Sequence, residues 1–197
     1  MTTARAHPRL GRGALPNRVL VSGGGGRDAF PMISAAILAM AELPRRKRPE
    51  MTVITGPLMD RELQTEAMRL GHLNGVEVLE HVPDLPSRMA HSDLLITMAG
   101  YNSINEALAV GCPIVTVPRL GPSAEQRLRA EALERAGLAH YLRREDLSAA
   151  SIARLLRRIP RSAKPNPLNT NGVQTAARVL ASLCTQSRRA EPERTHA

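Results

Sequence analysis

Short apolar runs alternate with amphipathic stretches along most of the chain, from Arg18 to Leu142. The apolar runs are rich in Val, Ile and Leu and have few polar interruptions, a pattern typical of strands that are buried on both faces of a sheet. The predicted strands cover residues 18–22, 51–55, 76–80, 93–97 and 113–117, with a shorter one at 139–142.

The stretches between these runs repeat their apolar residues at helical spacing. Ile33, Ala36, Ile37 and Met40, for example, follow the i, i+3, i+4, i+7 pattern of one helical face. The predicted helices cover residues 29–43, 60–71 (closed by Gly71), 86–90, 103–110 (stopped by Gly111), 123–137, 151–159 and 173–184.

Regular alternation of strand and helix predicts right-handed βαβ units and therefore a parallel sheet. We predict an α/β fold, a Rossmann-like, doubly wound parallel sheet of about six strands with extra C-terminal helices. In the common strand order 3-2-1-4-5-6, the first and fourth strands are neighbours at the switch point, where ligands bind beyond the carboxyl ends of the strands.

The chain divides into one large domain and its flanking segments. We expect a flexible leader at 1–17, the domain at 18–160, a Pro- and Asn-rich linker at 161–171, a C-terminal helix at 172–185 that packs back, and a disordered tail at 186–197. The composition, 43% hydrophobic and 23% charged, is ordinary for a globular protein. No signal-peptide pattern or membrane-length apolar stretch occurs, so we expect a cytoplasmic protein.

The formal net charge is +9, and part of it is concentrated in "RRKR", Arg45 to Arg48. Proteins that bind single-stranded nucleic acid usually stack bases on aromatic side chains, and aromatics make up only 2% of this chain. We therefore favour a solvated Arg-rich surface and expect no nucleic-acid partner. The alternative, a basic nucleic-acid binder, predicts a strongly salt-dependent affinity for DNA.

Four consecutive glycines, Gly23 to Gly26, follow the first predicted strand. Without side chains, their backbone N–H groups can point at an anion, and the next helix adds the positive end of its dipole. The alternative is a turn that needs a positive φ, for which one glycine suffices, so we favour anion binding. The loop after the fourth strand, residues 98–107, would face this loop across one crevice.

A dinucleotide site is a weaker interpretation of the same loop. Gly24, Gly26 and Ala29 fit G-x-G-x-x-A after a strand, but the second strand continues into Gly56 and Pro57 rather than into the expected acidic residue. The sequence also has no D-x-D and no His/Cys cluster. We therefore predict no metal site and no tightly bound cofactor.

The run "MAGYNSINEALAVGCPIVTVPRLGPSAEQRLRAEALERAGLA" resembles the donor-binding region of GT-B glycosyltransferases. It is most similar to the C-terminal domain of glycosyltransferase family 28, a family that includes bacterial peptidoglycan N-acetylglucosaminyltransferases. The likeness covers residues 18–142 and, more weakly, 146–183. It implies the C-terminal half of a GT-B fold, which binds a UDP-hexose or UDP-N-acetylhexosamine.

The resemblance also implies which residues contact the donor. The implied donor-binding residues are Ser22, Gly23, Gly24, Gly25, Gly26, Arg27, Val82, Gly100, Tyr101, Asn102, Ser103, Glu106, Glu125 and Gln126. The glycine loop and residues 100–103 would contact the diphosphate, Val82 the uracil edge, Glu106 the ribose, and residues 125–126 the sugar. The family needs no tightly bound metal, in agreement with the missing D-x-D.

Two capping boxes offer structural explanations for some of these residues. Ser103–Glu106 is S-x-x-E and Ser123–Gln126 is S-x-x-Q, so Glu106 and Gln126 could tie back to a helix start, a role that is compatible with donor binding. Glu125 departs from the family, which has glutamine there, and this departure favours a neutral sugar. The loop also departs from the family, in which a polar residue stands among the glycines.

The largest departure from the family is one of length. GT-B enzymes place an acceptor-binding domain with the catalytic base first, so we expect that domain on a missing segment or a separate chain, with possible peripheral association at the inner membrane face through it. The isolated chain would then be inactive in transfer. The alternatives are a non-catalytic nucleotide-sugar-binding partner subunit and an epimerase-like protein.

Overall fold

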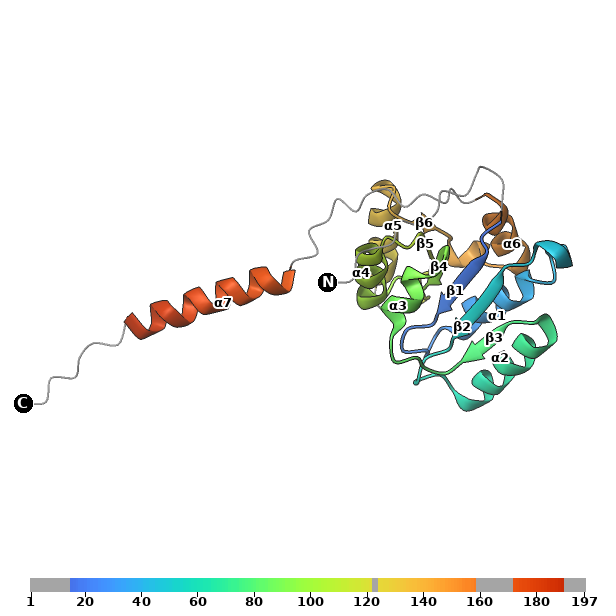
Figure 1. Ribbon diagram of the computed structural model, residues 1–197, viewed down its shortest axis with the longest axis horizontal. Coiled ribbons are helices and arrows are strands. Elements are labelled where there is room, and N and C mark those ends of the chain that lie inside the picture. Colours follow the sequence, from blue (N-terminus) through green and yellow to red (C-terminus); the bar gives the residue numbers. More distant parts are fainter. Residues whose placement is uncertain (1–14, 122–123, 159–171, 190–197) are drawn as a thin grey trace, which may run out of the picture. The chain divides into compact units, whose positions relative to one another are not determined.

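The computed structural model describes residues 15–121, 124–158 and 172–189. The chain separates into two units, with the division after Asn166. Among the described residues, the first unit holds the sheet and its helices, and the second holds one helix (Figure 1).

Six parallel strands form one sheet in the order β3-β2-β1-β4-β5-β6. The strands are β1 (Arg18–Ser22), β2 (Glu50–Ile54), β3 (Glu77–Leu79), β4 (Leu94–Thr97), β5 (Ile114–Thr116) and β6 (His140–Tyr141). The predicted strand order and the predicted parallel sheet are both confirmed. The first and fourth strands are indeed neighbours, and Ser22 is paired with Thr97 at their carboxyl ends.

Six helices and two short 3-10 turns complete the first unit in the residues described. The helices are α1 (Phe30–Ala39), α2 (Arg61–Asn74), α3 (Leu85–Ala90), α4 (Tyr101–Val110), α5 (Glu125–Arg135) and α6 (Ala149–Arg158), and the 3-10 turns are η1 (Arg45–Lys47) and η2 (Arg144–Asp146). Each predicted helix exists, with ends shifted by a few residues.

The helices form two layers, one on each face of the sheet. One apolar cluster joins α1, α2 and α6 to side chains such as Val19 and Val21 of β1, whereas Leu20 points into the second cluster with α3, α4 and α5. Successive strand residues alternate between faces, so both faces of the sheet are buried. This explains the continuous apolar character of the strands in the sequence.

Helix α2 ends later than predicted. Gly71 lies inside the helix, which continues to Asn74 and ends at Gly75, whose φ of 68° suits a left-handed C-cap. The reason for Gly71 is packing, because a Cβ there would lie 2.4 Å from Cγ2 of Val78. The predicted stop at Gly71 was wrong because a glycine that serves close packing looks the same in a sequence as one that serves a turn.

The first unit begins before Arg18. Leu15 packs against the apolar cluster of α1, α2 and α6. The backbone N–H groups of Asn17 and Arg18 donate to Oδ2 of Asp93 at 2.8 and 3.0 Å. The end of the expected leader is therefore part of the domain, and residues 1–14 lie outside the described residues.

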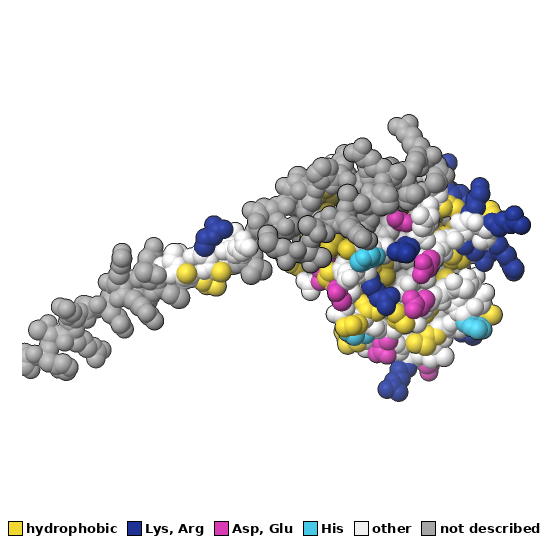
Figure 2. Space-filling view, in the orientation of Figure 1, with side chains coloured by type: hydrophobic (Ala, Val, Ile, Leu, Met, Phe, Trp, Pro, Cys, Tyr) yellow, Lys and Arg dark blue, Asp and Glu magenta, His cyan; other side chains and the backbone are white. Residues whose placement is uncertain are grey.

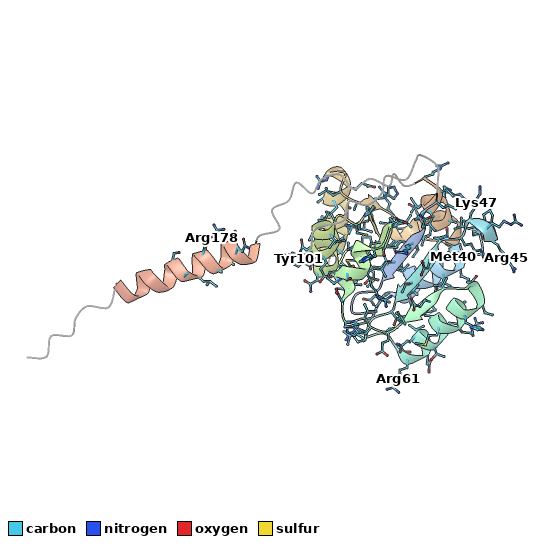
Figure 3. The ribbon with its side chains drawn as sticks, viewed as in Figure 1. Met40, Arg45, Lys47, Arg61, Tyr101 and Arg178 are labelled. Atoms are coloured by element: carbon cyan, nitrogen blue, oxygen red, sulfur yellow. The ribbon has the colours of Figure 1, made fainter. Side chains whose placement is uncertain are left out.

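The "RRKR" segment forms η1 and the residue after it. Arg45, Arg46 and Lys47 are exposed, and Arg45 and Lys47 are labelled at one end of the domain in Figure 3. Dark-blue side chains gather at the same end in Figure 2.

A guanidinium nitrogen of Arg157 on α6 donates to the carbonyl of Glu42 at 2.7 Å, which holds the last turn of α6 beside the turn that follows α1.

The second unit contains α7 (Gly172–Arg189), which runs a few residues beyond the predicted end at 185. Val179 and Leu180 are exposed on this helix. The expectation that it packs back on the domain stays a prediction, and the expected linker at 161–171 and most of the expected tail lie outside the described residues. In the part of the chain that the structure describes, no helix is long and apolar enough to cross a membrane.

Candidate functional site

Two loops meet where β1 and β4 end side by side. The loop from Ser22 to α1 carries the four glycines, and the loop from Thr97 to α4 carries Gly100 at the helix start. Because β1 and β4 are paired in the sheet, these loops lie on adjacent positions at its carboxyl edge. The prediction that the loops after the first and fourth strands lie next to each other is therefore confirmed.

Half of the glycine run is explained by close backbone packing. A Cβ on Gly23 would lie 2.5 Å from the carbonyl oxygen of Thr55, and one on Gly26 would lie 2.6 Å from the same oxygen. Gly26 also has a φ of 102°. The loop after β2 presses on these residues, and the N–H of Leu58 donates to the carbonyl of Gly25 at 2.7 Å. Gly23 and Gly26 are therefore required by the fold itself.

The two middle glycines face outward. Gly24 and Gly25 are exposed, and no described atom lies within 4 Å of a Cβ added at Gly24. The N–H of Gly24 points at Oγ of the buried Ser22, 3.4 Å away, and the side chain of Arg27 is exposed. The part of the loop that is open to an anion is thus Gly24, Gly25 and Arg27.

Helix α4 opens directly at this edge. Its N-cap is Gly100, which has no side chain to accept from the first turn, so the N–H groups of residues 101–103 can serve a ligand. Tyr101, labelled in Figure 3, is 67% exposed. Asn102 is also exposed, whereas Ser103 is buried.

The capping box expected at Ser103–Glu106 is wrong. The helix begins two residues before Ser103, so Ser103 lies in the first turn and Glu106 in the second. Ser103 is buried, and Ile104 is buried in the apolar cluster of α3, α4 and α5, which favours a helix that begins before Ser103. Glu106 is half-buried, and desolvation raises the pKa of its carboxyl above 4.5. It is three residues from Ser103 and therefore on the same helical face.

The capping box expected at Ser123–Gln126 also fails in its second half. Ala124, the N-cap of α5, has no polar side chain, and Oε1 of Gln126 accepts from the backbone N–H of Arg119 at 3.2 Å. Ser123 lies outside the described residues. Gln126 therefore holds the β5–α5 loop, while its N-terminal neighbour Glu125 is exposed.

A second link joins the β5–α5 loop to the glycine loop. A guanidinium nitrogen of Arg119 lies 3.1 Å from Oδ2 of Asp28, which follows Arg27. The pair reaches across the end of β4, which lies between β1 and β5 in the sheet. The β5–α5 loop and the glycine loop are thus tied by one ion pair, a contact that the sequence analysis did not predict.

Two further residues at the site were missed. Ala99 has a φ of 64°, an unusual value for a residue other than glycine, and no sequence signal announces it. Arg129 donates to the carbonyl of Ala99 at 2.7 Å and pairs with the Glu125 carboxylate. Only the i, i+4 spacing of Glu125 and Arg129 could have suggested the second contact.

Val82 lies apart from these residues in sequence but at the same edge. It follows β3, is buried, and belongs to the cluster that contains Ala99 and Ile104. The carboxyl edge of the sheet thus carries Val82, the open glycines, the start of α4 and the start of α5. Contact with a donor stays a prediction for each residue.

The chemistry of the site is that of recognition by hydrogen bonds. It offers backbone N–H groups to an anion, and carboxylate and amide oxygens to hydroxyl groups. Among the described residues, no group of three His, Cys, Asp or Glu side chains could hold a metal ion. Cys112 is buried beyond α4, where desolvation raises the pKa of its thiol to about 12, so it stays protonated and is a poor nucleophile.

Comparison with known proteins agrees with this geometry. A relative from Chromobacterium violaceum, a UDP-N-acetylglucosamine–N-acetylmuramyl-(pentapeptide) pyrophosphoryl-undecaprenol N-acetylglucosamine transferase, is 36% identical over 128 residues, which are 64% of this chain and 35% of the relative. The chain thus spans about a third of the curated relatives that it matches.

Solved structures of glycosyltransferases share the fold. Acinetobacter baumannii MurG matches 85% of this chain and 50% of its own, with a TM-score of 0.68 and 19% identity. The calicheamicin glycosyltransferase CalG4 matches 95% of this chain and 46% of its own, with a TM-score of 0.61 and 22% identity. The model of the glycosyltransferase family 28 C-terminal domain matches residues 18–183. The chain belongs to this family, as the resemblance in the sequence indicated.

Proposed function

We propose that the edge above β1 and β4 binds the diphosphate of a UDP-type nucleotide sugar and that the chain is the donor-binding part of a hexosyltransferase. One observation carries the proposal: the exposed glycines Gly24 and Gly25 and the uncapped start of α4 follow two neighbouring strands. Backbone N–H groups and the positive end of a helix dipole favour a phosphate at this place.

The other parts of the donor fit the residues around this edge. Val82 would offer backbone groups to the uracil ring, and Glu106 would accept from both hydroxyls of the ribose, because a carboxylate has two acceptor oxygens. Residues 125–126 would reach the sugar. The name of the Chromobacterium violaceum relative gives UDP-N-acetylglucosamine as its donor, which supports a UDP-hexose or UDP-N-acetylhexosamine here.

Transfer would be a direct displacement with inversion, in which backbone N–H groups stabilise the leaving diphosphate. The acceptor and the general base would come from a GT-B N-terminal domain or a partner chain. We propose no tightly bound metal or cofactor, an expectation supported by the absence of a D-x-D motif from the sequence. The same relative is named for an acceptor linked to undecaprenol, a long hydrocarbon alcohol, which supports peripheral association with the inner membrane face through that partner.

Calorimetric titration tests the proposal on the full 197-residue chain. We expect saturable heat with UDP, UDP-N-acetylglucosamine or UDP-glucose, and weaker binding of a GDP-sugar. If none of the UDP ligands binds, the proposed function is wrong.

A matched pair of variants locates the diphosphate. Position 25 has room for a side chain, since the nearest described atom to an added Cβ is Cδ1 of Leu58 at 3.5 Å. Gly25→Asp would place a carboxylate against the phosphates, and we expect affinity for UDP to fall at least about tenfold. Gly25→Asn has nearly the same size without the charge, and we expect a loss of less than about threefold. Equal losses in both variants would argue against an anion at this loop.

A further inference from the structure

Arg129 lies one turn into α5 but contacts the start of α4. Its side chain is only 20% exposed, an unusual burial for an arginine on a helix of polar residues. Two of its nitrogens are used in different directions, one toward the Ala99 carbonyl and one toward the Glu125 carboxylate. Its guanidinium carbon also lies 5.6 Å from the centre of the Tyr101 ring.

The contact with Ala99 falls on a strained residue. A φ of 64° is unfavourable for an alanine, and such a conformation persists only where the surroundings hold it. Ala99 is fully buried and immediately precedes Gly100, the N-cap of α4. The turn at Ala99 therefore sets the direction in which the first N–H groups of α4 point.

The contact with Tyr101 acts on the other side of the same N-cap. Tyr101 is the first residue of α4, and a guanidinium over an aromatic ring is attracted by the ring face. Arg129 thus holds the residue before Gly100 through a hydrogen bond and the residue after it through the ring.

The third contact concerns charge. Glu125 is at the start of α5 and 66% exposed, and its carboxylate would repel a diphosphate bound nearby. Pairing with Arg129 balances this charge. The other cation in the first turns of α5, Arg127, acts elsewhere, since it pairs with Glu131 at 2.8 Å.

From these contacts we infer that Arg129 is a positioning residue for the phosphate end of the donor. It touches no donor atom itself, but holds the first turn of α4 in the direction that phosphate binding needs. This inference rests on the proposed function and names the side chain on which its phosphate subsite depends.

The test separates phosphate binding from nucleoside binding. Uridine has no phosphate and would use Val82 and Glu106, whereas UDP would also use the start of α4. In Arg129→Ala we expect affinity for UDP, measured by calorimetry, to fall at least about tenfold, because the first turn of α4 would no longer be held in the direction that phosphate binding needs. Affinity for uridine, measured by NMR titration, should change less than about threefold.

Arg127→Ala is the control, because it removes an arginine from the same helix that pairs only along the surface in the described structure. We expect it to bind both ligands as the parent chain does. Arg129→Lys keeps the charge but cannot reach Ala99 and Glu125 together, so we expect it to recover less than half of the lost binding energy.

Three results would overturn the inference: unchanged affinity for UDP in Arg129→Ala, equal losses for UDP and uridine, or an equal loss of UDP affinity in Arg127→Ala. Failure of the proposed function is a different result, since the parent chain would then bind no UDP at all.

Discussion

The two loops that border the candidate site are shaped by opposite means. The glycine loop holds its course because side chains are absent, so the backbone of the β2–α2 loop can approach Gly23 and Gly26 to less than 3 Å from where a Cβ would be. The start of α4 holds its course because one long side chain, Arg129, reaches Ala99 and Tyr101 from another helix.

This difference shows how two surfaces of one site can differ in their tolerance of amino-acid substitutions. The glycine loop is part of the packed interior on one side and open only at Gly24 and Gly25. The α4 side depends on a contact that substitution can weaken without a collision. A change at the packed glycines Gly23 or Gly26 should therefore act mainly on folding, and a change at Arg129 mainly on binding.

The largest effect should come from Gly26→Ala. A Cβ there would lie 2.6 to 2.9 Å from three backbone atoms, and the φ of 102° is unfavourable for any residue with a side chain. We expect a loss of at least about 3 kcal/mol in the free energy of unfolding, measured by urea denaturation.

Gly25→Ala is the comparison for that measurement. The nearest described atom to its Cβ is 3.5 Å away, an ordinary contact, so we expect a change within about 0.5 kcal/mol. Similar losses in the two variants would mean that the glycine run is uniform and that the division between packed and open glycines is wrong.

A smaller effect should come from the ion pair between the glycine loop and the β5–α5 loop. Arg119 and Asp28 are both more than a third exposed, so screening by water limits the pair, and a double-mutant cycle with Asp28→Asn and Arg119→Gln should give a coupling of about 0.2–1 kcal/mol. The coupling should shrink in 0.5 M salt. A coupling that salt leaves unchanged would contradict a mainly electrostatic link.

The smallest effect concerns Glu106 on the α4 side. Burial raises the pKa of this carboxyl above 4.5, so the folded state holds its proton more tightly than the unfolded state does. The stability of the parent chain should therefore fall, relative to Glu106→Gln, as the pH rises through the usual carboxyl range and the raised value.

Denaturation curves at pH 4, 5, 6 and 7 measure this difference. The advantage of Glu106→Gln should grow with pH and then stay constant. An advantage that is largest at pH 4 would show that the carboxyl is stabilised when ionised, the opposite of desolvation.

The fold was predictable because its signals are local. Apolar runs without polar interruptions and helical repeats between them are enough to predict a parallel sheet, and connection rules then favour the order 3-2-1-4-5-6. The site was predictable only in outline, from the glycines of one loop and the resemblance of the residues after β4.

The missed features depend on contacts between distant segments. Asp28 and Arg119 are separated by 91 positions, and Arg129 and Ala99 by 30, so no spacing rule joins them. Gly71 and Ser103 show a related limit: a glycine under Val78 resembles a helix stop, and a serine inside a helix resembles a cap. In each case tertiary packing decides which of two structural roles the residue has, and the local sequence is compatible with both.

The contact between the glycine loop and the β2–α2 loop bears on any attempt to transplant this site. The N–H of Leu58 donates to the carbonyl of Gly25. Gly56 lies so close to Gly24 that a Cβ added to Gly56 would be 2.3 Å from the carbonyl oxygen of Gly24. Residues 23–26 and 55–59 therefore form a single structural unit, because each segment shapes the backbone of the other. Grafting the glycines alone onto another Rossmann-like scaffold would leave them without the neighbouring backbone that shapes them, whereas moving both loops together would carry the shape along.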